Sequence, residues 1–361
     1  MAGPDSIKIT TLFDTSPASY YRIPCLSIDG GGTLISFANR RLDTVSDTAK
    51  EVHLVYRYWQ ASHGAWSSVY ELIAQPRWVA ALGTVYPRVG KHGVNVTYGL
   101  SSGKVPNSLS DSGNEFEPGF YISTGTGNDT TWDQSKMIVN TDSFPIKPNS
   151  HGSSGGIILK HGPHKGRVVL PARYATKAGE EIENLQTNHY NCSLFSDDNG
   201  KTWQTSEPVQ VGTGEGCLVE LSDGRIYYNS RAYFLDGKRR TAWSYDGGKT
   251  YQDFCVDDRL IEPIGGCNAG MVTYPRALTE EKDIILFCNP ASDKRERLTV
   301  RASYDGAQTW PISKTIHLGP AAYSSIAVSS DGTIYVLYEN GRKSPYEKIS
   351  LAEFNIKWLT N

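Results

Sequence analysis

The sequence predicts an all-β protein that folds as a six-bladed β-propeller with Asp-box repeats. Short runs of alternating Val, Ile, Tyr and Thr, separated by Gly-rich turns, fill most of the 361-residue chain. This alternation is typical of strands that are buried on one face. A helical pattern is almost absent, because the best candidate, residues 175–185, is short and interrupted by Gly179. A turn motif also recurs along the chain.

The recurring motif begins at Ser196, Ser244 and Ser303, and each copy has Ser-x-Asp, a glycine in the turn, and Thr followed by Trp or Tyr. We expect the Ser and Asp side chains to bond the loop backbone, glycine to adopt a left-handed conformation and the aromatic ring to pack between sheets. The starts at 196, 244 and 303 are 48 and 59 residues apart. With one four-stranded blade per repeat, the chain has room for about six blades.

The blades are expected to form a single domain over residues 1–361, because no linker, low-complexity run or charge block divides the chain. In chain order they are predicted at residues 20–59, 66–132, 137–203, 215–251 and 267–310, with the sixth around Tyr323 and Glu339. The last run, residues 349–358, is available to close the ring against the N-terminal segment.

Four predicted β-hairpins bring charged residues to one pole. Tyr323 lies eight residues before an Asp-Gly turn and Glu339 lies seven after it, so an antiparallel hairpin places them near each other. Hairpins around residues 29–30, 161–166 and 223–224 have the same construction. If the hairpins are equivalent elements of a repeated fold, their free ends gather these residues at one pole: Arg22, Arg41, Arg173, Glu215, Arg231, Tyr323 and Glu339.

The bulk composition gives no support to several function classes. The formal net charge is -2 and charges of both signs are interspersed, so no nucleic-acid or membrane-surface partner is expected. No apolar run is long enough to span a bilayer, and residues 1–10 lack the pattern of a signal peptide.

The six cysteines include no CxxC pair, which disfavours a zinc site. Cys255 and Cys267 are the best candidates for a disulfide. Three Asn-x-Ser/Thr triplets, starting at Asn95, Asn128 and Asn191, would accept glycans in a secreted chain. They favour an extracellular location.

Four motifs, taken with the three Asp boxes, resemble one known family: Tyr-Arg-Ile-Pro at 21–24, Glu-x-x-x-x-Glu-Leu-x-Asp-Gly at 215–224, Asn-Ser-Arg at 229–231 and Ala-Tyr-Ser at 322–324. The chain resembles the exo-sialidases of glycoside hydrolase family 33 over nearly its whole length, and its overall character is similar to the fungal sialidases, some of which prefer the deaminated sugar KDN. The resemblance implies a six-bladed propeller and a retaining enzyme. It also implies hydrolysis of terminal N-acetylneuraminic acid, KDN or both from glycoconjugates, with no metal or organic cofactor.

In this family three arginines clamp the substrate carboxylate, and by motif they correspond to Arg22, Arg231 and Arg295. Arginine suits the task because its planar fork binds a carboxylate bidentately and stays charged. Arg297 and Arg301 are alternatives to Arg295. Strand alternation places all three on one face, so counting does not separate them.

The resemblance also makes Tyr323 the nucleophile and Glu215 the base that takes its proton, in a mechanism with a covalent tyrosyl-enzyme intermediate. A neutral phenol suits this substrate, because the carboxylate on the anomeric carbon would repel an anionic nucleophile. The family spacing of 25 residues from Arg22 selects Asp47 as the acid, while Asp43 is a solvated alternative in the same loop. Glu339 is expected to orient Arg22.

Arg41 is expected to line the pocket, and Arg173 to contact the glycerol chain or the C5 substituent together with Tyr174. Many family members have an aromatic residue in place of Arg173, so the choice between N-acetylneuraminic acid and KDN stays open. Asn268 and Trp59 are weaker candidates for the site, and a structural role is expected for both. Two other functions stay open as well: a trans-sialidase, and a sialoglycan-binding lectin without catalysis.

Overall fold

The computed structural model describes residues 6–102, 119–128, 131–140, 154–175 and 189–361, and this part of the chain is almost entirely β-structure. Its strands form four sheets of nine, seven, five and four strands. Two short helices are present in the described ranges, η1 (Arg276–Leu278) and α1 (Ile356–Thr360). The prediction of an all-β protein is confirmed, but the final run does not stay extended to residue 358, because Asn355 caps α1 by accepting from the Trp358 N–H.

The nine-stranded sheet consists of two groups of strands that pack against each other in one hydrophobic cluster. A single parallel pair, Val52 with Val79, joins the groups. The first group comprises β2 (Tyr20–Ile28), β3 (Leu34–Arg41), β4 (Val52–Gln60), β5 (Ala65–Trp66) and β6 (Tyr70–Ile73). The second comprises β7 (Trp78–Pro87), β8 (Val94–Ser102), β9 (Gly119–Gly125) and β10 (Asp133–Lys136).

The next two sheets each contain four consecutive antiparallel strands, and in the five-stranded sheet β11 adds to β15 in parallel. The five-stranded sheet comprises β11 (Ile138–Asn140), β12 (Ile157–Ile158), β13 (Val168–Ala175), β14 (His189–Ser196) and β15 (Thr202–Thr205). The four-stranded sheet comprises β16 (Thr213–Glu220), β17 (Ile226–Ala232), β18 (Lys238–Ser244) and β19 (Gln252–Ile261).

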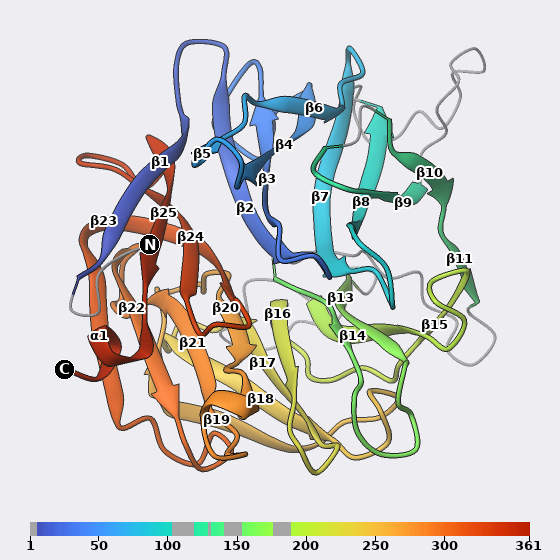
Figure 1. Cartoon of the computed structure of the whole chain (residues 1–361), viewed down its shortest axis with the longest axis vertical. Helices are drawn as coiled ribbons and strands as arrows, with labels where there is room; N and C mark the ends of the chain where they lie inside the picture. The colour runs from blue at the N-terminus through green and yellow to red at the C-terminus, as the bar shows by residue number, and fades with distance from the viewer. Residues whose placement is uncertain (1–5, 103–118, 129–130, 141–153, 176–188) are drawn as a thin grey trace.

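The seven-stranded sheet also contains two groups, which share one long strand. It comprises β20 (Gly270–Thr273), β21 (Ile285–Pro290), β22 (Glu296–Ser303), β23 (Ile312–Val328), β24 (Ile334–Asn340), β25 (Lys348–Phe354) and β1 (Lys8–Asp14). Residues 312–320 of β23 pair with β22, and residues 321–328 pair with β24. The first strand of the chain, β1, pairs with the last, β25, as predicted for the two ends. Figure 1 shows the groups following one another around the molecule until red β25 lies beside blue β1.

The predicted hairpins are present. β2 pairs with β3, β12 with β13, β16 with β17 and the end of β23 with β24, all antiparallel. In the last of these, Gly332 has φ +85° in the turn, a conformation that glycine adopts without strain. Tyr323 and Glu339 therefore lie together at the far end of this hairpin, where the Tyr323 N–H donates to Oε2 of Glu339 at 3.1 Å.

The three repeated turns share one hydrogen-bond pattern. At Asp246, the carboxylate accepts from the N–H and the hydroxyl of Thr250 at 2.9 and 2.7 Å, while Ser244 Oγ donates to Oδ1 at 2.9 Å. The copies at Asp198 and Asp305 repeat these bonds. In the third copy an alanine, Ala307, takes the second left-handed position with φ +64°.

The core lies between neighbouring groups of strands. One cluster packs Cys217 and Tyr227 of the four-stranded sheet against Ile285 and Phe287 of the seven-stranded sheet. Trp203, the aromatic residue of the first repeated turn, is fully buried. Each repeat therefore buries one face against the next repeat, as in other proteins built from repeated units.

Two predictions about covalent chemistry are wrong. Cys255 is exposed, Cys267 is buried, and both are free thiols. Asn191 is also fully buried and donates to the Ala172 carbonyl oxygen at 3.2 Å, so it is closed to a glycan in the folded chain. Of the other two glycosylation triplets, the one at Asn95 has a half-buried asparagine, and residues 129–130 of the one at Asn128 lie outside the described ranges. Most of the candidate helix 175–185 also lies outside them.

Candidate active site

The first arginine of the site is held by a buried carboxylate. Nε of Arg22 donates to Oε1 of Glu339 at 2.7 Å, and the Ile23 N–H donates to the same oxygen at 2.9 Å. Glu339 is fully buried and Arg22 nearly so. Burial alone lowers the pKa of Arg22, but Glu339, Tyr346 and Tyr323 together outweigh it and raise the pKa, so the guanidinium stays charged. Glu339 lies where the sequence predicted it, bound to Arg22.

A tyrosine, a glutamate and a second arginine form the centre of the site. The Tyr323 hydroxyl donates to Oε1 of Glu215 at 2.5 Å. Nη1 of Arg231 donates to Oε2 of Glu215 at 2.9 Å and also to the Tyr323 oxygen at 2.9 Å. Glu215 and Arg231 come from the hairpin of β16 and β17, and Tyr323 comes from β23, which is distant from that hairpin in the sequence.

The electrostatics of this triad keep the proton on the phenol. Burial and the neighbouring Glu215 carboxylate raise the pKa of Tyr323 well above its ordinary value. Burial also acts to raise the pKa of Glu215, but Arg231 and Arg173 outweigh it and hold that pKa well below its usual range. The resting pair is therefore a phenol donating to a carboxylate, which has the geometry of a nucleophile beside its base.

Of the three arginines near residue 300, only Arg295 reaches the site. Its guanidinium carbon lies 5.5 Å from the centre of the Tyr323 ring. Arg297 is exposed with φ +58°, and Arg301 donates to Oδ1 of Asn289 at 2.8 Å. The expectation that all three share a face is wrong, because the register of β22 shifts on both sides of Leu298 and breaks the alternation.

Register shifts also occur in the strands that carry Arg22, Glu215 and Tyr323. Register shifts interrupt the ladder between Arg22 and Cys25, between Thr213 and Gly216, and between Ala321 and Ser324. Bulges of this kind bend a strand and redirect a side chain, and they are common beside active sites. Glu215 and Tyr323 lie within two of these shifts, and Arg22 borders the third.

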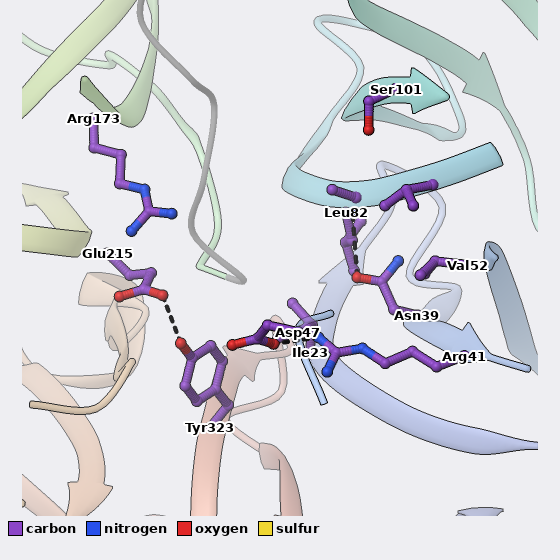
Figure 2. Close-up of a pocket in the computed structure, with 12 residues that line it drawn as sticks. Ile23, Asn39, Arg41, Asp47, Val52, Leu82, Ser101, Arg173, Glu215 and Tyr323 are labelled. Atoms are coloured by element: carbon purple, nitrogen blue, oxygen red, sulfur yellow. Dashed lines mark hydrogen bonds and ion pairs between the residues drawn. The ribbon is translucent and has the colours of Figure 1, made fainter. Parts of the chain in front are cut away.

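A cavity of about 360 Å³ opens beside Tyr323. Its lining combines charged groups with small apolar side chains (Figure 2): Ile23, Asn39, Arg41, Asp47, Val52, Val79, Ala81, Leu82, Ser101, Arg173, Glu215 and Tyr323. Arg173, from β13, donates to the Tyr233 hydroxyl at 2.7 Å. The volume and lining suit a ligand with both polar and apolar faces.

Asp47 extends from the loop between β3 and β4 toward the same cavity, and Figure 2 shows its carboxylate pointing toward Tyr323. Nη2 of Arg41 donates to Oδ1 of Asp47 at 2.6 Å, although the Asp47 side chain is 84% exposed. Desolvation acts to raise the pKa of Asp47, but Arg41 outweighs it and the pKa lies below its ordinary value. Asp47 is thus an ionised carboxylate in this structure. Asp43, the alternative acid, binds the Lys50 N–H at 3.1 Å and does not line the cavity.

Two weaker candidates have structural contacts. The Asn268 amide donates to the Ser324 carbonyl oxygen at 3.3 Å, which supports the strand that carries Tyr323. Trp59 packs edge-on against Trp66, with the Lys8 ammonium 5.8 Å from its ring. Tyr174 was expected beside Arg173, and the structure describes its backbone but not its side chain.

Several residues that support the site were not predicted from the sequence. The Tyr233 ring lies 4.6 Å from the guanidinium carbon of Arg231; its place two residues after Arg231, on the same face of a strand, was a usable signal. Arg239 and Glu262 form a fully buried ion pair at 2.7 Å. Glu262 also accepts from the N–H of Ala232, the residue after Arg231, at 2.8 Å. No motif marks this pair.

Within the described ranges, no group of three or more His, Cys, Asp or Glu side chains is arranged to hold a metal ion. No helix in the same residues has the length and apolarity needed to cross a membrane.

The chain is similar to several known proteins. The family described as BNR repeat-like domain matches residues 44–336. A sialidase of Micromonospora viridifaciens is 36% identical over 243 residues, which cover 66% of this chain and 35% of the relative. Sialidase-2 of Cricetulus griseus is 24% identical over 96% of this chain and 95% of its own length. The chain thus spans about a third of the bacterial relative and nearly all of the hamster one.

Solved structures give the same class of fold. A Hadza microbial sialidase superposes with a TM-score of 0.77 at 22% identity, covering 94% of this chain and 66% of that chain. The sialidase of Trypanosoma rangeli superposes with a TM-score of 0.73 at 19% identity, covering 99% and 60%. The chain therefore shares the fold of these two sialidases. Because the family match covers most of the sequence, the chain belongs to the family described as BNR repeat-like domain.

Proposed function

We propose that this chain is a retaining exo-α-sialidase that hydrolyses terminal N-acetylneuraminic acid, KDN or both from glycoconjugates. The observation that carries the proposal is the 2.5 Å hydrogen bond from Tyr323 to Glu215, with Arg22, Arg231 and Arg295 around it. A family membership shared with sialidases supports the same reaction.

The proposed architecture is a six-bladed β-propeller with Asp-box turns, formed as one domain over residues 1–361. The sheet orders support it, because the nine- and seven-stranded sheets each divide into two groups of strands and the other two sheets add one group each. The repeated turns at Asp198, Asp246 and Asp305 have the pattern expected of Asp boxes.

In the first proposed step Arg22, Arg231 and Arg295 hold the substrate carboxylate. The Tyr323 oxygen attacks the anomeric carbon, and the bond between that carbon and the leaving oxygen breaks. The phenolic proton moves to Glu215 and Asp47 gives a proton to the leaving oxygen. In the second step Asp47 takes a proton from water, the water oxygen displaces Tyr323, and Glu215 returns its proton to the phenolate. Two inversions retain the configuration.

The ion pair of Asp47 with Arg41 sets a condition on this mechanism. An acid must carry a proton, whereas Asp47 has a pKa below its ordinary value while Arg41 binds it. The leaving oxygen must therefore replace Arg41 as the partner of Asp47. We expect kcat/KM to be highest at acidic pH and to fall as the pH rises and Asp47 stays ionised.

The central test is turnover of an aryl sialoside by variants of Tyr323 and Asp47. Tyr323→Phe removes the nucleophilic oxygen, and Asp47→Ala removes the acid. Each is expected to lower kcat/KM by about 10²-fold or more. Asp43→Ala, an exposed aspartate in the same loop, is the matched control and should remain near the wild-type rate. Near-wild-type rates for both Tyr323→Phe and Asp47→Ala would refute the assignment.

The sugar preference rests on Arg173, which lines the cavity where many family members have an aromatic residue. We propose that Arg173 contacts the glycerol chain or the C5 substituent. Turnover of matched N-acetylneuraminyl and KDN aryl glycosides, by wild type and Arg173→Phe, tests this. An unchanged ratio of the two rates in the variant would contradict it.

A trans-sialidase shares every step up to the tyrosyl intermediate, and product analysis with lactose as acceptor separates it from a hydrolase. A lectin would need the arginines but not the Tyr323–Glu215 pair. The expected ligand in each case is a terminal sialic acid or KDN, and we propose an extracellular location for the protein.

A further inference from the structure

The loop between β24 and β25 places one tyrosine between two arginines of the site. The guanidinium carbon of Arg22 lies 4.0 Å from the centre of the Tyr346 ring. Nη1 of Arg295 donates to the Tyr346 hydroxyl at 2.7 Å. A neutral ring attracts one cation through its face while its oxygen accepts from the other. Tyr346 thus allows the positively charged side chains of Arg22 and Arg295 to lie on either side of one residue.

The three arginines differ in their charge partners. Arg22 pairs with Glu339 at 2.7 Å and Arg231 with Glu215 at 2.9 Å. The polar contacts of Arg295 in the described part of the chain are neutral acceptors, the Tyr346 hydroxyl and, at 3.5 Å, the Gly266 carbonyl oxygen. Arg295 therefore keeps a positive charge that no carboxylate among the described residues offsets at ion-pair distance. Its orientation depends mainly on the shorter bond, to Tyr346.

Hydrogen bonds within the protein hold the loop that carries Tyr346. The Glu347 carboxylate accepts from the backbone N–H groups of residues 342, 343 and 344 at 3.0, 2.8 and 2.9 Å. Thr15 Oγ1 donates to the Tyr346 carbonyl oxygen at 3.3 Å. The Tyr346 ring packs against the buried cluster of Cys267, Ala322 and Tyr323. Bonds within the protein therefore support the contact between Tyr346 and Arg295.

We propose that Tyr346 is a positioning residue that aims Arg295 at the carboxylate of the bound sugar and so sets the affinity of the site for carboxylated ligands. This inference rests on the proposed function. Because the Tyr346 oxygen engages one Nη1 donor, it fixes the plane of the guanidinium fork and leaves other donors of the fork for the ligand. A fork with a fixed plane loses less freedom when it binds a carboxylate.

The test compares Tyr346→Phe with wild type on two probes, a 2,3-unsaturated sialic acid and its primary carboxamide. The phenylalanine ring keeps the contact with Arg22 and removes only the oxygen that accepts from Arg295. We expect the Kd of the acid to rise about 5- to 20-fold and the Kd of the amide to change less than about twofold, because the amide carries no charge for Arg295. With an aryl sialoside, KM should rise more than kcat falls.

Tyr335→Phe is the control, because this half-buried tyrosine lies near the turn end of the β23–β24 hairpin, away from the arginines. A purely structural role would change the affinity for both probes alike. An equal rise for acid and amide, or an unchanged Kd for the acid, would overturn the inference while turnover of the aryl sialoside by wild type upholds the proposed function. No binding of the acid by wild type would overturn both.

Discussion

At the scale of single residues, the centre of the site is a set of opposed pKa shifts. Tyr323 and Glu215 share a hydrogen bond, and the same burial acts to raise the pKa of both. The arginines decide the outcome, because Arg231 and Arg173 favour the anion of Glu215. Glu215 is therefore a carboxylate that helps to hold the folded site together as well as a candidate base.

Glu215→Gln is predicted to lower kcat/KM by about 10²- to 10⁴-fold, because glutamine cannot take the phenolic proton. It should also change how stability depends on pH. The folded pKa of Glu215 lies below its ordinary value of 4.5, so its ionisation stabilises the fold above about pH 4.5 and that contribution is lost as the pH falls toward the folded pKa.

Urea unfolding at several pH values checks this. The difference in free energy of unfolding between wild type and Glu215→Gln should shrink as the pH is lowered below about 4.5. Glu280→Gln, at a side chain that is 90% exposed, should show no such trend. A difference that stays constant down to strongly acidic pH would contradict the depressed pKa.

At the scale of elements, the two ends of each hairpin have different roles, one at the site and one at the repeated turns. The site end carries the bulges that redirect Arg22, Glu215 and Tyr323. The repeated turns lie at the other end: Ser244 pairs with Ile226, close to the turn at residues 221–225 and five residues from Arg231. At about 3.3 Å per residue, this turn is roughly 17 Å along the sheet from the site.

Asp246→Ala is predicted to lower the free energy of unfolding by about 1–3 kcal/mol, because it leaves the Thr250 N–H and hydroxyl without their acceptor. Thermal or urea unfolding measures the loss. The kcat/KM of the folded enzyme should stay within about twofold of wild type, since the turn is distant from Tyr323. Asp223→Ala, in the exposed turn of the same sheet, should cost less stability. A large loss of activity in folded Asp246→Ala would contradict the separation of the two ends.

At the scale of the whole molecule, the two ends of the chain meet in one sheet. β1 pairs with β25, and Leu12 and Phe13 of β1 join the cluster of Ile349 and Leu351. Nη1 of Arg57, from β4, donates to the Leu12 carbonyl oxygen at 2.6 Å. The N-terminal strand thus connects the last group of strands to the first, and it covers the edge of β25 that would otherwise be unpaired.

Phe13→Ala is predicted to lower the free energy of unfolding by about 3–5 kcal/mol, because Phe13 is 1% exposed and its removal leaves a cavity at this junction. Ile9→Ala on the same strand, at a side chain that is 50% exposed, should cost less than about 1 kcal/mol. Urea unfolding followed by both tryptophan fluorescence and circular dichroism measures both. Equal losses for the two variants would show that the strand does not close the molecule.

The sequence by itself determined the strand content, the hairpins and the repeated turns, because these follow from period-two alternation and from local turn chemistry. The motif residues of the site came from the resemblance of the sequence to a known family. The sequence also indicated that the chain ends would meet. Only the tertiary structure separated Arg295 from Arg297 and Arg301, left Cys255 and Cys267 unbridged, buried Asn191 and paired Asp47 with Arg41. It alone revealed the supporting roles of Tyr346 and of the Arg239–Glu262 pair. The physical reason is that bulges, burial and charge pairing depend on which distant strands become neighbours, and no local pattern records that.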